Sequence, residues 1–326
     1  MARILLRVAY DGTAYAGWQR QDNGPSIQGA LEEALAPLAG GPVTVMGAGR
    51  TDAGVHAHGQ AAHVDLPDSI TPEVVVRATN TRLPSDIRVR TAVVVPDDFH
   101  ARFSAVGKAY RYSWLVSRTG HPLLARTTCL VSPPVDLGRM AAAAARLVGT
   151  HDFAAFQSTG SPVSTTVRTI TGVDLGVRPP EDLGLRLDAQ ERLVEFDIEG
   201  DGFLRHMVRA LAGTLLEIGQ RRREVDDMDR LLAGAPRGEA GPNAPPQGLM
   251  LMAAQYPGRV MPRCRDAGMS EALSHPRHFR HSNEALRRRR CCALNANLRH
   301  SRHRSIAALP RAGSRMFPGP WRSMNC

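Results

Sequence analysis

The chain has 326 residues and a formal net charge of +10, which allows about two domains with buried cores. The charge is unevenly placed: residues 258–326 carry 15 arginines against three acids (net +12), and residues 1–257 carry 26 basic against 28 acidic side chains (net −2). The total therefore does not by itself indicate a nucleic-acid-binding protein, because any such contact in the first 257 residues needs a local basic face.

Cysteine content and hydropathy argue against two other classes of protein. Cys129 is the single cysteine of residues 1–257, so we expect no disulfide framework and a reducing, cytoplasmic location. No apolar run reaches the roughly 18–20 residues of a membrane helix. Arg7 and Asp11 interrupt the short apolar start, which is not typical of a signal peptide, and no membrane partner is expected.

Residues 1–105 predict a first α+β domain. The predicted elements are, in chain order, a strand at 4–10, a helix from residue 27 capped by Ser26 and ended by Gly40-Gly41, two strands flanking residues 47–59, a helix beginning at Thr71-Pro72-Glu73, and a strand at 87–95. This β-α-β-β-α-β order is that of a ferredoxin-like domain, with a largely antiparallel sheet and helices on one face.

Residues 106–257 predict a second domain of similar order. Its predicted elements are a strand at 110–116, a helix capped by Asp136 and ended by Gly149, strands at 166–177, 183–188 and 192–199, a helix from Phe203 to about Glu217, and a closing strand at 249–256. Residues 258–326 have scattered hydrophobic residues and a block of four arginines at 287–290, which predicts a disordered basic tail.

The segment from Gly47 to Gly59, G-A-G-R-T-D-A-G-V-H-A-H-G, is too rich in glycine for the interior of a helix or strand. We interpret it as a loop that presents Asp52, and loops on rigid scaffolds often carry chemistry. A guanidinium two residues away, Arg50, could hold the carboxylate ionised and oriented. Spacing alone favours a simpler interpretation, a turn-stabilising aspartate with a weak surface ion pair.

Two further functions are open from the residues alone. His56 and His58, with Asp52 nearby, could begin the site of a metal-dependent hydrolase, because imidazole and carboxylate are zinc ligands. A non-catalytic RNA-binding module with two ferredoxin-like halves is the other alternative, although its strands lack the dense aromatic pattern of RNA-recognition strands.

Five ordered motifs resemble the tRNA pseudouridine synthases of the TruA family. They are Y-D-G-T-x-Y-x-G-W-Q-R-Q at Tyr10–Gln21, A-G-R-T-D-A-G-V-H at Ala48–His56, P-D-D-F-H-A-R-F-S-A at Pro96–Ala105, K-x-Y-x-Y at Lys108–Tyr112 and H-M-V-R at His206–Arg209. The resemblance covers most of residues 1–257 and none of the tail.

The resemblance implies an isomerase that converts uridine to pseudouridine at positions 38, 39 and 40 of the tRNA anticodon stem-loop, without cofactor or metal. It places the site in a cleft between the two domains, with Asp52 as nucleophile acting on a flipped nucleotide. Arg50 and Arg209 would orient Asp52, and Tyr110 would stack on the target base. Without the resemblance, Tyr110 is an ordinary strand aromatic and Arg209 an ordinary exposed helix arginine. The resemblance also implies a homodimer that binds tRNA.

Overall fold

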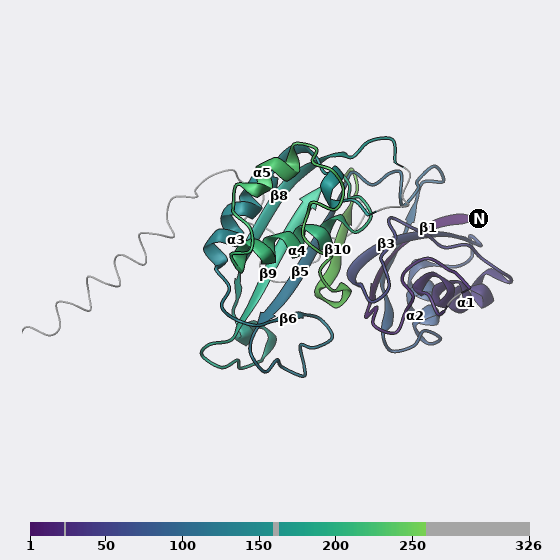
Figure 1. Ribbon diagram of the computed structural model, residues 1–326. Coiled ribbons are helices and arrows are strands. Elements are labelled where there is room, and N and C mark those ends of the chain that lie inside the picture. The colour runs from purple at the N-terminus through teal and green to yellow at the C-terminus, as the bar shows by residue number, and fades with distance from the viewer. Residues whose placement is uncertain (23, 159–162, 259–326) are drawn as a thin grey trace, which may run out of the picture. The chain divides into compact units, whose positions relative to one another are not determined.

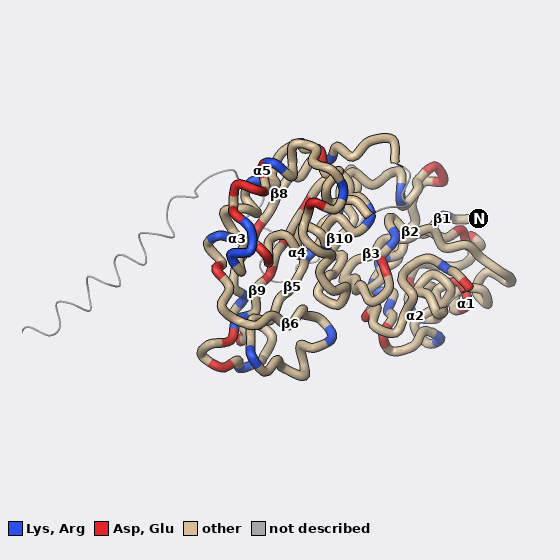
Figure 2. Tube along the Cα trace, in the orientation of Figure 1, with Lys and Arg blue, Asp and Glu red and all other residues tan. Residues whose placement is uncertain are grey.

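The computed structural model describes residues 1–22, 24–158 and 163–258. All of these residues belong to one folded unit. The predicted tail, apart from Gly258, lies outside the described residues. Acidic and basic positions are interspersed along the described chain, as expected from its nearly balanced charge (Figure 2).

The secondary structure mixes strands and helices throughout (Figure 1). The strands are β1 (Ala2–Tyr10), β2 (Met46–Gly47), β3 (His56–Leu66), β4 (Ile87–Val95), β5 (Gly107–Val116), β6 (Cys129–Val131), β7 (Gly149–Asp152), β8 (Val167–Arg178), β9 (Arg192–Gly200) and β10 (Leu249–Gln255). The α-helices are α1 (Ile27–Ala39), α2 (Pro72–Asn80), α3 (Leu137–Ala144), α4 (Met207–Gly219) and α5 (Asp227–Leu232). None of the described helices has the length and hydropathy of a transmembrane segment.

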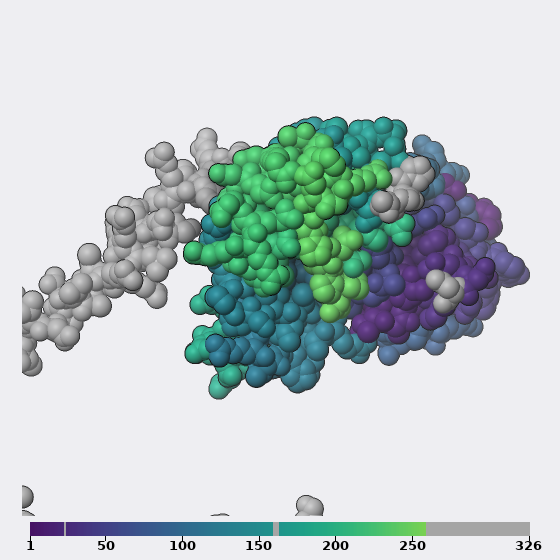
Figure 3. All heavy atoms as spheres, in the orientation of Figure 1, coloured from purple at the N-terminus to yellow at the C-terminus, as the bar shows by residue number. Residues whose placement is uncertain are grey.

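The described strands form one sheet, in the order β4-β1-β3-β10-β5-β9-β8-β7, with β2 beside β3 and β6 beside β5. Its pairing is mostly antiparallel, so the predicted α+β class is confirmed. The last strand, β10, joins the two halves: it is parallel to β3, with Met250 opposite His56, and antiparallel to β5. In Figure 3 the yellow-green spheres of this C-terminal strand adjoin those of the N-terminal half.

The helices cover one face of this sheet. Ile4 and Leu6 of β1 belong to the large core cluster that also contains Leu31 of α1 and Leu211 of α4. Leu5 points to the opposite face, because side chains alternate along a strand, and there it packs in a smaller cluster with Ala48, Ala61, Val95, Phe99 and Ala101. Because Ala48 is the first residue after β2, this smaller cluster holds the start of the loop that follows β2.

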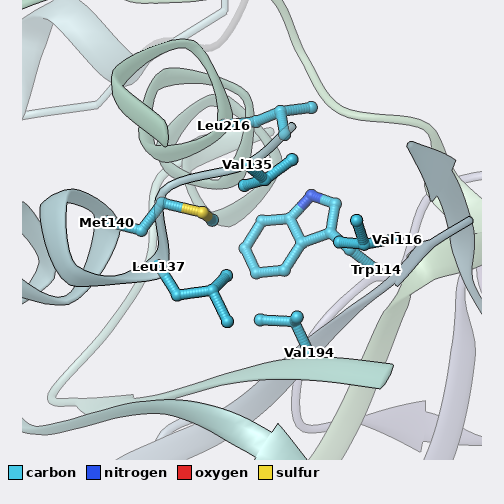
Figure 4. A pocket seen from close by; sticks show the side chains of 7 residues that line it. All are labelled: Trp114, Val116, Val135, Leu137, Met140, Val194 and Leu216. Atoms are coloured by element: carbon cyan, nitrogen blue, oxygen red, sulfur yellow. The ribbon is translucent and has the colours of Figure 1, made fainter. Parts of the chain in front are cut away.

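Trp114 fills the space between the sheet and helices α3 and α4 in the second half (Figure 4). The small hollow around it is lined only by apolar side chains, namely Trp114, Val116, Val135, Leu137, Met140, Val194 and Leu216. The indole Nε1 has no hydrogen-bond partner among the described residues. With no polar group placed to orient a ligand, this hollow is part of the core packing.

Most helix and strand boundaries follow from local chemistry. The Ser26 Oγ accepts a hydrogen bond from the Gly29 N–H (3.2 Å) at the start of α1, and Gly40, with φ of 74°, ends it in the left-handed conformation. Asp136 caps α3 in the same way by accepting from the Arg139 N–H (3.2 Å). The caps predicted from sequence at Ser26 and Asp136 are confirmed.

The predicted bounds of α3 and of the glycine-rich loop differ from the structure. Helix α3 ends at Ala144, and Gly149, which was predicted to end it, begins β7. Residues 56–59 of the predicted loop belong to β3.

Two other predicted elements also differ from the structure. Residues 183–188 form no strand. Strands β8 and β9 pair directly with each other, residues 170–178 against residues 193–200, and residues 183–188 lie in the connection beyond the paired region. Helix α4 begins at Met207 rather than Phe203, because His206 has a φ of 63°, which interrupts the right-handed helix.

Candidate active site

The loop that carries Asp52 lies between β2 and β3 and is anchored at both ends. On the β2 side, the Ala48 N–H donates to the Ala61 carbonyl (2.7 Å) and the Gln60 Nε2 donates to the Gly49 carbonyl (2.8 Å). Within the loop, the Val55 N–H donates to the Asp52 carbonyl (3.1 Å) and closes a turn just before β3. The position of the Asp52 backbone is therefore fixed by the strands rather than by the loop alone.

A second loop, residues 12–18, packs directly against the Asp52 loop. The Trp18 N–H donates to the Thr51 carbonyl (3.0 Å), and the Tyr10 hydroxyl shares a hydrogen bond with Thr51 Oγ1 (2.8 Å). Gly17 has a φ of 110°, and a Cβ there would lie 2.6 Å from the Thr51 carbonyl oxygen. Only glycine fits this close approach without displacing the backbone next to Asp52.

Two basic side chains from the second half of the chain face the Asp52 carboxylate. Its Oδ2 lies 3.4 Å from His206 Nε2 and 3.5 Å from Arg209 Nη1. The Asp52 side chain keeps 34% of its surface exposed, whereas His206 and Arg209 keep 19% and 15%. Both distances are long for a hydrogen bond, so the Asp52 carboxylate stays accessible to a ligand while the Arg209 guanidinium beside it is more buried.

Arg209 is held by the chain segment that precedes β10. Its Nε donates to the Ala244 carbonyl (2.7 Å), and the Ala244 N–H donates back to the Arg209 carbonyl (3.0 Å). With the Nε occupied, the guanidinium is fixed in direction and its Nη1 is left for Asp52. The next residues of this segment also reach the Asp52 loop, since a Cβ at Gly54 would lie 3.1 Å from the Pro246 ring.

His206 is a site residue that the sequence interpretation did not single out. Its Nδ1 lies 2.7 Å from Ser158 Oγ, and burial lowers the pKa of the ring, an effect that the Asp52 charge only partly offsets. A neutral ring that accepts the Ser158 hydroxyl at Nδ1 has its proton on Nε2, facing Asp52. Its place in the H-M-V-R motif, close to Arg209, was the available signal.

Tyr110 of β5 lies close enough to Asp52 for the carboxylate charge to act on its phenol. Its ring is buried and packs edge-on against Phe203, with 5.1 Å between the ring centres. Burial raises the pKa of the Tyr110 phenol, and the Asp52 charge adds to that rise. Tyr112, two residues on, is fully buried and donates to the Pro245 carbonyl (2.9 Å). Both tyrosines belong to the large core cluster, so a stacking role for Tyr110 stays a prediction.

Arg50 is placed differently from the other three predicted site residues. Its side chain is exposed, and the described residues form no ion pair between Arg50 and Asp52. The two basic groups beside the carboxylate are instead Arg209 and His206. A role for Arg50 at Asp52 therefore stays a prediction.

The metal-hydrolase alternative rests on His56 and His58 of β3; His58 is half-buried and has an interaction partner of its own. His56 is buried, and its Nδ1 accepts a hydrogen bond from the Gly12 N–H (3.1 Å). His63 is buried too and accepts from the Ala101 N–H (3.1 Å). Across residues 1–22, 24–158 and 163–258, no three His, Cys, Asp or Glu side chains are grouped so that they could hold a metal ion.

Comparison with known proteins agrees with the motifs around Asp52 and Arg209. The sequence profile of a family described as tRNA pseudouridine synthase matches residues 7–104 and 143–257. The chain belongs to this family. The family resemblance inferred from the five motifs is therefore confirmed.

Bacterial relatives match over nearly their whole length. A protein from Syntrophotalea carbinolica named tRNA pseudouridine synthase A is 46% identical over 256 residues, covering 78% of this chain and 97% of the relative. Proteins of the same name from Geobacter sp. and Myxococcus xanthus are 43% and 44% identical, covering 79% and 78% of this chain and 100% and 92% of the relatives.

Proposed function

We propose that this chain isomerises uridine to pseudouridine at positions 38, 39 and 40 in the anticodon stem-loop of tRNA. Family membership and relatives named tRNA pseudouridine synthase A support an isomerase that acts on tRNA. The main structural support for placing this reaction at Asp52 is its partly exposed carboxylate, 3.5 Å from the guanidinium of Arg209.

The reaction needs no external reagent. The bond between uracil N1 and ribose C1′ breaks, the base rotates, and a bond forms between uracil C5 and the same C1′. The proton on C5 leaves and N1 gains one, so atoms and electrons balance without oxidant, reductant or group donor. One correctly placed carboxylate is enough to open such a path by forming a transient covalent bond.

Asp52 is the proposed nucleophile. Arg209, fixed by its hydrogen bond to the Ala244 carbonyl, faces the carboxylate and can hold it in one direction. The Nε2–H of a neutral His206 points toward the same Oδ2. Both groups orient the carboxylate and leave its exposed side for the nucleotide.

The target nucleotide has to leave the RNA helix to reach Asp52, because the reacting atoms of a stacked nucleotide are inaccessible. Tyr110 is proposed to stack on the flipped base, a contact worth about 1–3 kcal/mol. Arg50, exposed on the same loop as Asp52, is proposed to turn toward Asp52 in the bound complex and to enter the space that the base vacates.

The resemblance also supports two further parts of this proposal. The protein is a homodimer in which each tRNA contacts both subunits, and it is located in the cytoplasm. Sedimentation of the protein with and without tRNA tests the first.

Mapping of the modified nucleotides tests the function. Unmodified tRNA transcripts carrying uridine at only one of positions 38, 39 and 40 are incubated with the protein, beside a transcript without uridine at any of them. We expect pseudouridine at each single site and none in the fourth transcript. Product at other uridines alone, or no product in any transcript, would contradict the proposal.

A further inference from the structure

Lys108 is the single lysine of the chain, and its side chain lies against the Asp52 loop. It belongs to β5, where its backbone is paired with Gly200 of β9 and Ala254 of β10. A Cβ built on Gly49 would lie 2.8 Å from Lys108 Nζ and 3.4 Å from its Cε. The ammonium therefore rests on the backbone of the residue that precedes Arg50.

Among residues 1–22, 24–158 and 163–258, no ion pair involves this ammonium. Lys108 is half-buried, and no described carboxylate forms an ion pair with it. Burial lowers its pKa, and the guanidinium of Arg102 lowers it further. Arg102 and Arg50 are both exposed. A partly desolvated cation among other cations is unfavourable until an anion binds beside it.

Position along β5 connects this cation to the target nucleotide. Lys108 and Tyr110 are two residues apart, so their side chains leave the same face of the strand about 7 Å from each other. An anion bound at Lys108 while a base stacks on Tyr110 would thus belong to the backbone close to that base.

Resting on the proposed function, we infer that Lys108 binds a backbone phosphate of the RNA immediately next to the target uridine. A compact ammonium acts on phosphate as a point charge, whereas arginine brings a larger planar group. Lys108 is the one position of the chain at which this compact cation stands instead of arginine.

The test uses the full chain with Lys108→Met, which keeps the apolar stem and removes the charge. Affinity for unmodified tRNA is measured over a series of salt concentrations, and kcat at saturating tRNA. The matched control is Arg77→Met, which removes an exposed charge from α2, a helix that packs on α1 and β4. A second variant, Lys108→Gln, repeats the measurement with a polar side chain in case Lys108→Met folds poorly.

We expect Lys108→Met to weaken tRNA binding about five- to tenfold at low salt and to reduce the slope of log affinity against log salt by about one, as for one lost phosphate contact. We expect kcat to change less than about threefold, and Arg77→Met to leave the slope unchanged. An unchanged slope in both Lys108 variants would overturn the inference, as would a collapse of kcat at unchanged affinity, which indicates a packing role.

The test of the Lys108 contact can fail or succeed independently of the test of the proposed function. If the unmutated protein forms no pseudouridine but the slope still falls in the variant, the phosphate contact stands and the proposed reaction fails. If the unmutated protein forms pseudouridine and the slope does not change, the inference about Lys108 alone is wrong.

Discussion

The Nη1 of Arg209 lies 3.5 Å from the Oδ2 of Asp52, although the two residues belong to different halves of the chain. Asp52 is placed by the loop between β2 and β3, and Arg209 by the first turn of α4. The site is therefore complete only when both halves pack together, and strand β10 joins them by pairing with β3 on one side and β5 on the other.

Substitution of Arg209 should lower the rate of the chemical step more than it lowers tRNA affinity. Arg209→Met removes the cation beside Asp52, and we expect kcat to fall about 10²- to 10³-fold, the range for loss of one fixed electrostatic partner. Arg209→Lys keeps the charge but loses the Nε–H bond to Ala244, and we expect an intermediate loss. Single-turnover rates and tRNA dissociation constants are the measurements.

The control for this prediction is Arg205→Met, because Arg205 is exposed in the segment just before α4 and forms no ion pair with Asp52 in the described part of the chain. We expect it to change the dissociation constant modestly and to leave the single-turnover rate intact. Equal losses of rate in the Arg205 and Arg209 variants would show that only the general positive charge around the start of α4 matters.

Gly17→Ala should displace the Asp52 loop. The new Cβ would lie 2.6 Å from the Thr51 carbonyl oxygen at a residue with φ of 110°, and a strained backbone of this kind costs about 1–3 kcal/mol. We expect a lower free energy of unfolding in urea and a fall in kcat of tenfold or more. Gly176→Ala is the matched control, since a Cβ at Gly176 meets nothing within 4 Å. Equal activity of the two variants would contradict the role given to Gly17.

Local patterns predicted much of this fold because the forces that decide those elements act within a few residues. The strand predicted at 87–95 is β4, and the helix predicted after Ser26 is α1. Alternation of side chains and capping hydrogen bonds are complete within each of these segments. The pairing of β10 with β3 depends instead on residues almost two hundred positions apart, and no local pattern indicates it.

The candidate site was predicted in part for the same reason. Asp52 was indicated by a glycine-rich loop and a family motif, and Arg209 by a motif alone. His206 was missed because its left-handed backbone, its bond to Ser158 and its approach to Asp52 all depend on tertiary packing. The exposed position of Arg50 also depends on packing, since spacing in the sequence gives two residues proximity but not direction.

Stability should fall in mild acid through His63. This ring is buried, its Nδ1 accepts from the Ala101 N–H, and burial lowers its pKa to about 4. As pH falls below 6.5, the unfolded chain binds a proton at His63 that the folded chain does not. Stability is therefore present at neutral pH and is lost between pH 6.5 and about 4.

The check for this prediction compares wild type with His63→Asn, whose side-chain oxygen can accept the Ala101 N–H without titrating. We expect wild type to lose about 1–2 kcal/mol more than the variant when urea unfolding at pH 7 is compared with pH 5, allowing for solvent screening. Parallel losses in the two proteins would mean that other groups cause the acid sensitivity.

Single-turnover formation of pseudouridine by Asp52→Asn, measured beside its tRNA affinity, tests the central claim most directly. The substitution keeps the shape of the side chain and removes the charge and the nucleophile. We predict no detectable product, with a tRNA dissociation constant and an unfolding midpoint close to those of wild type. Product formed by the variant at a substantial fraction of the wild-type rate would contradict the assignment of Asp52 as the nucleophile.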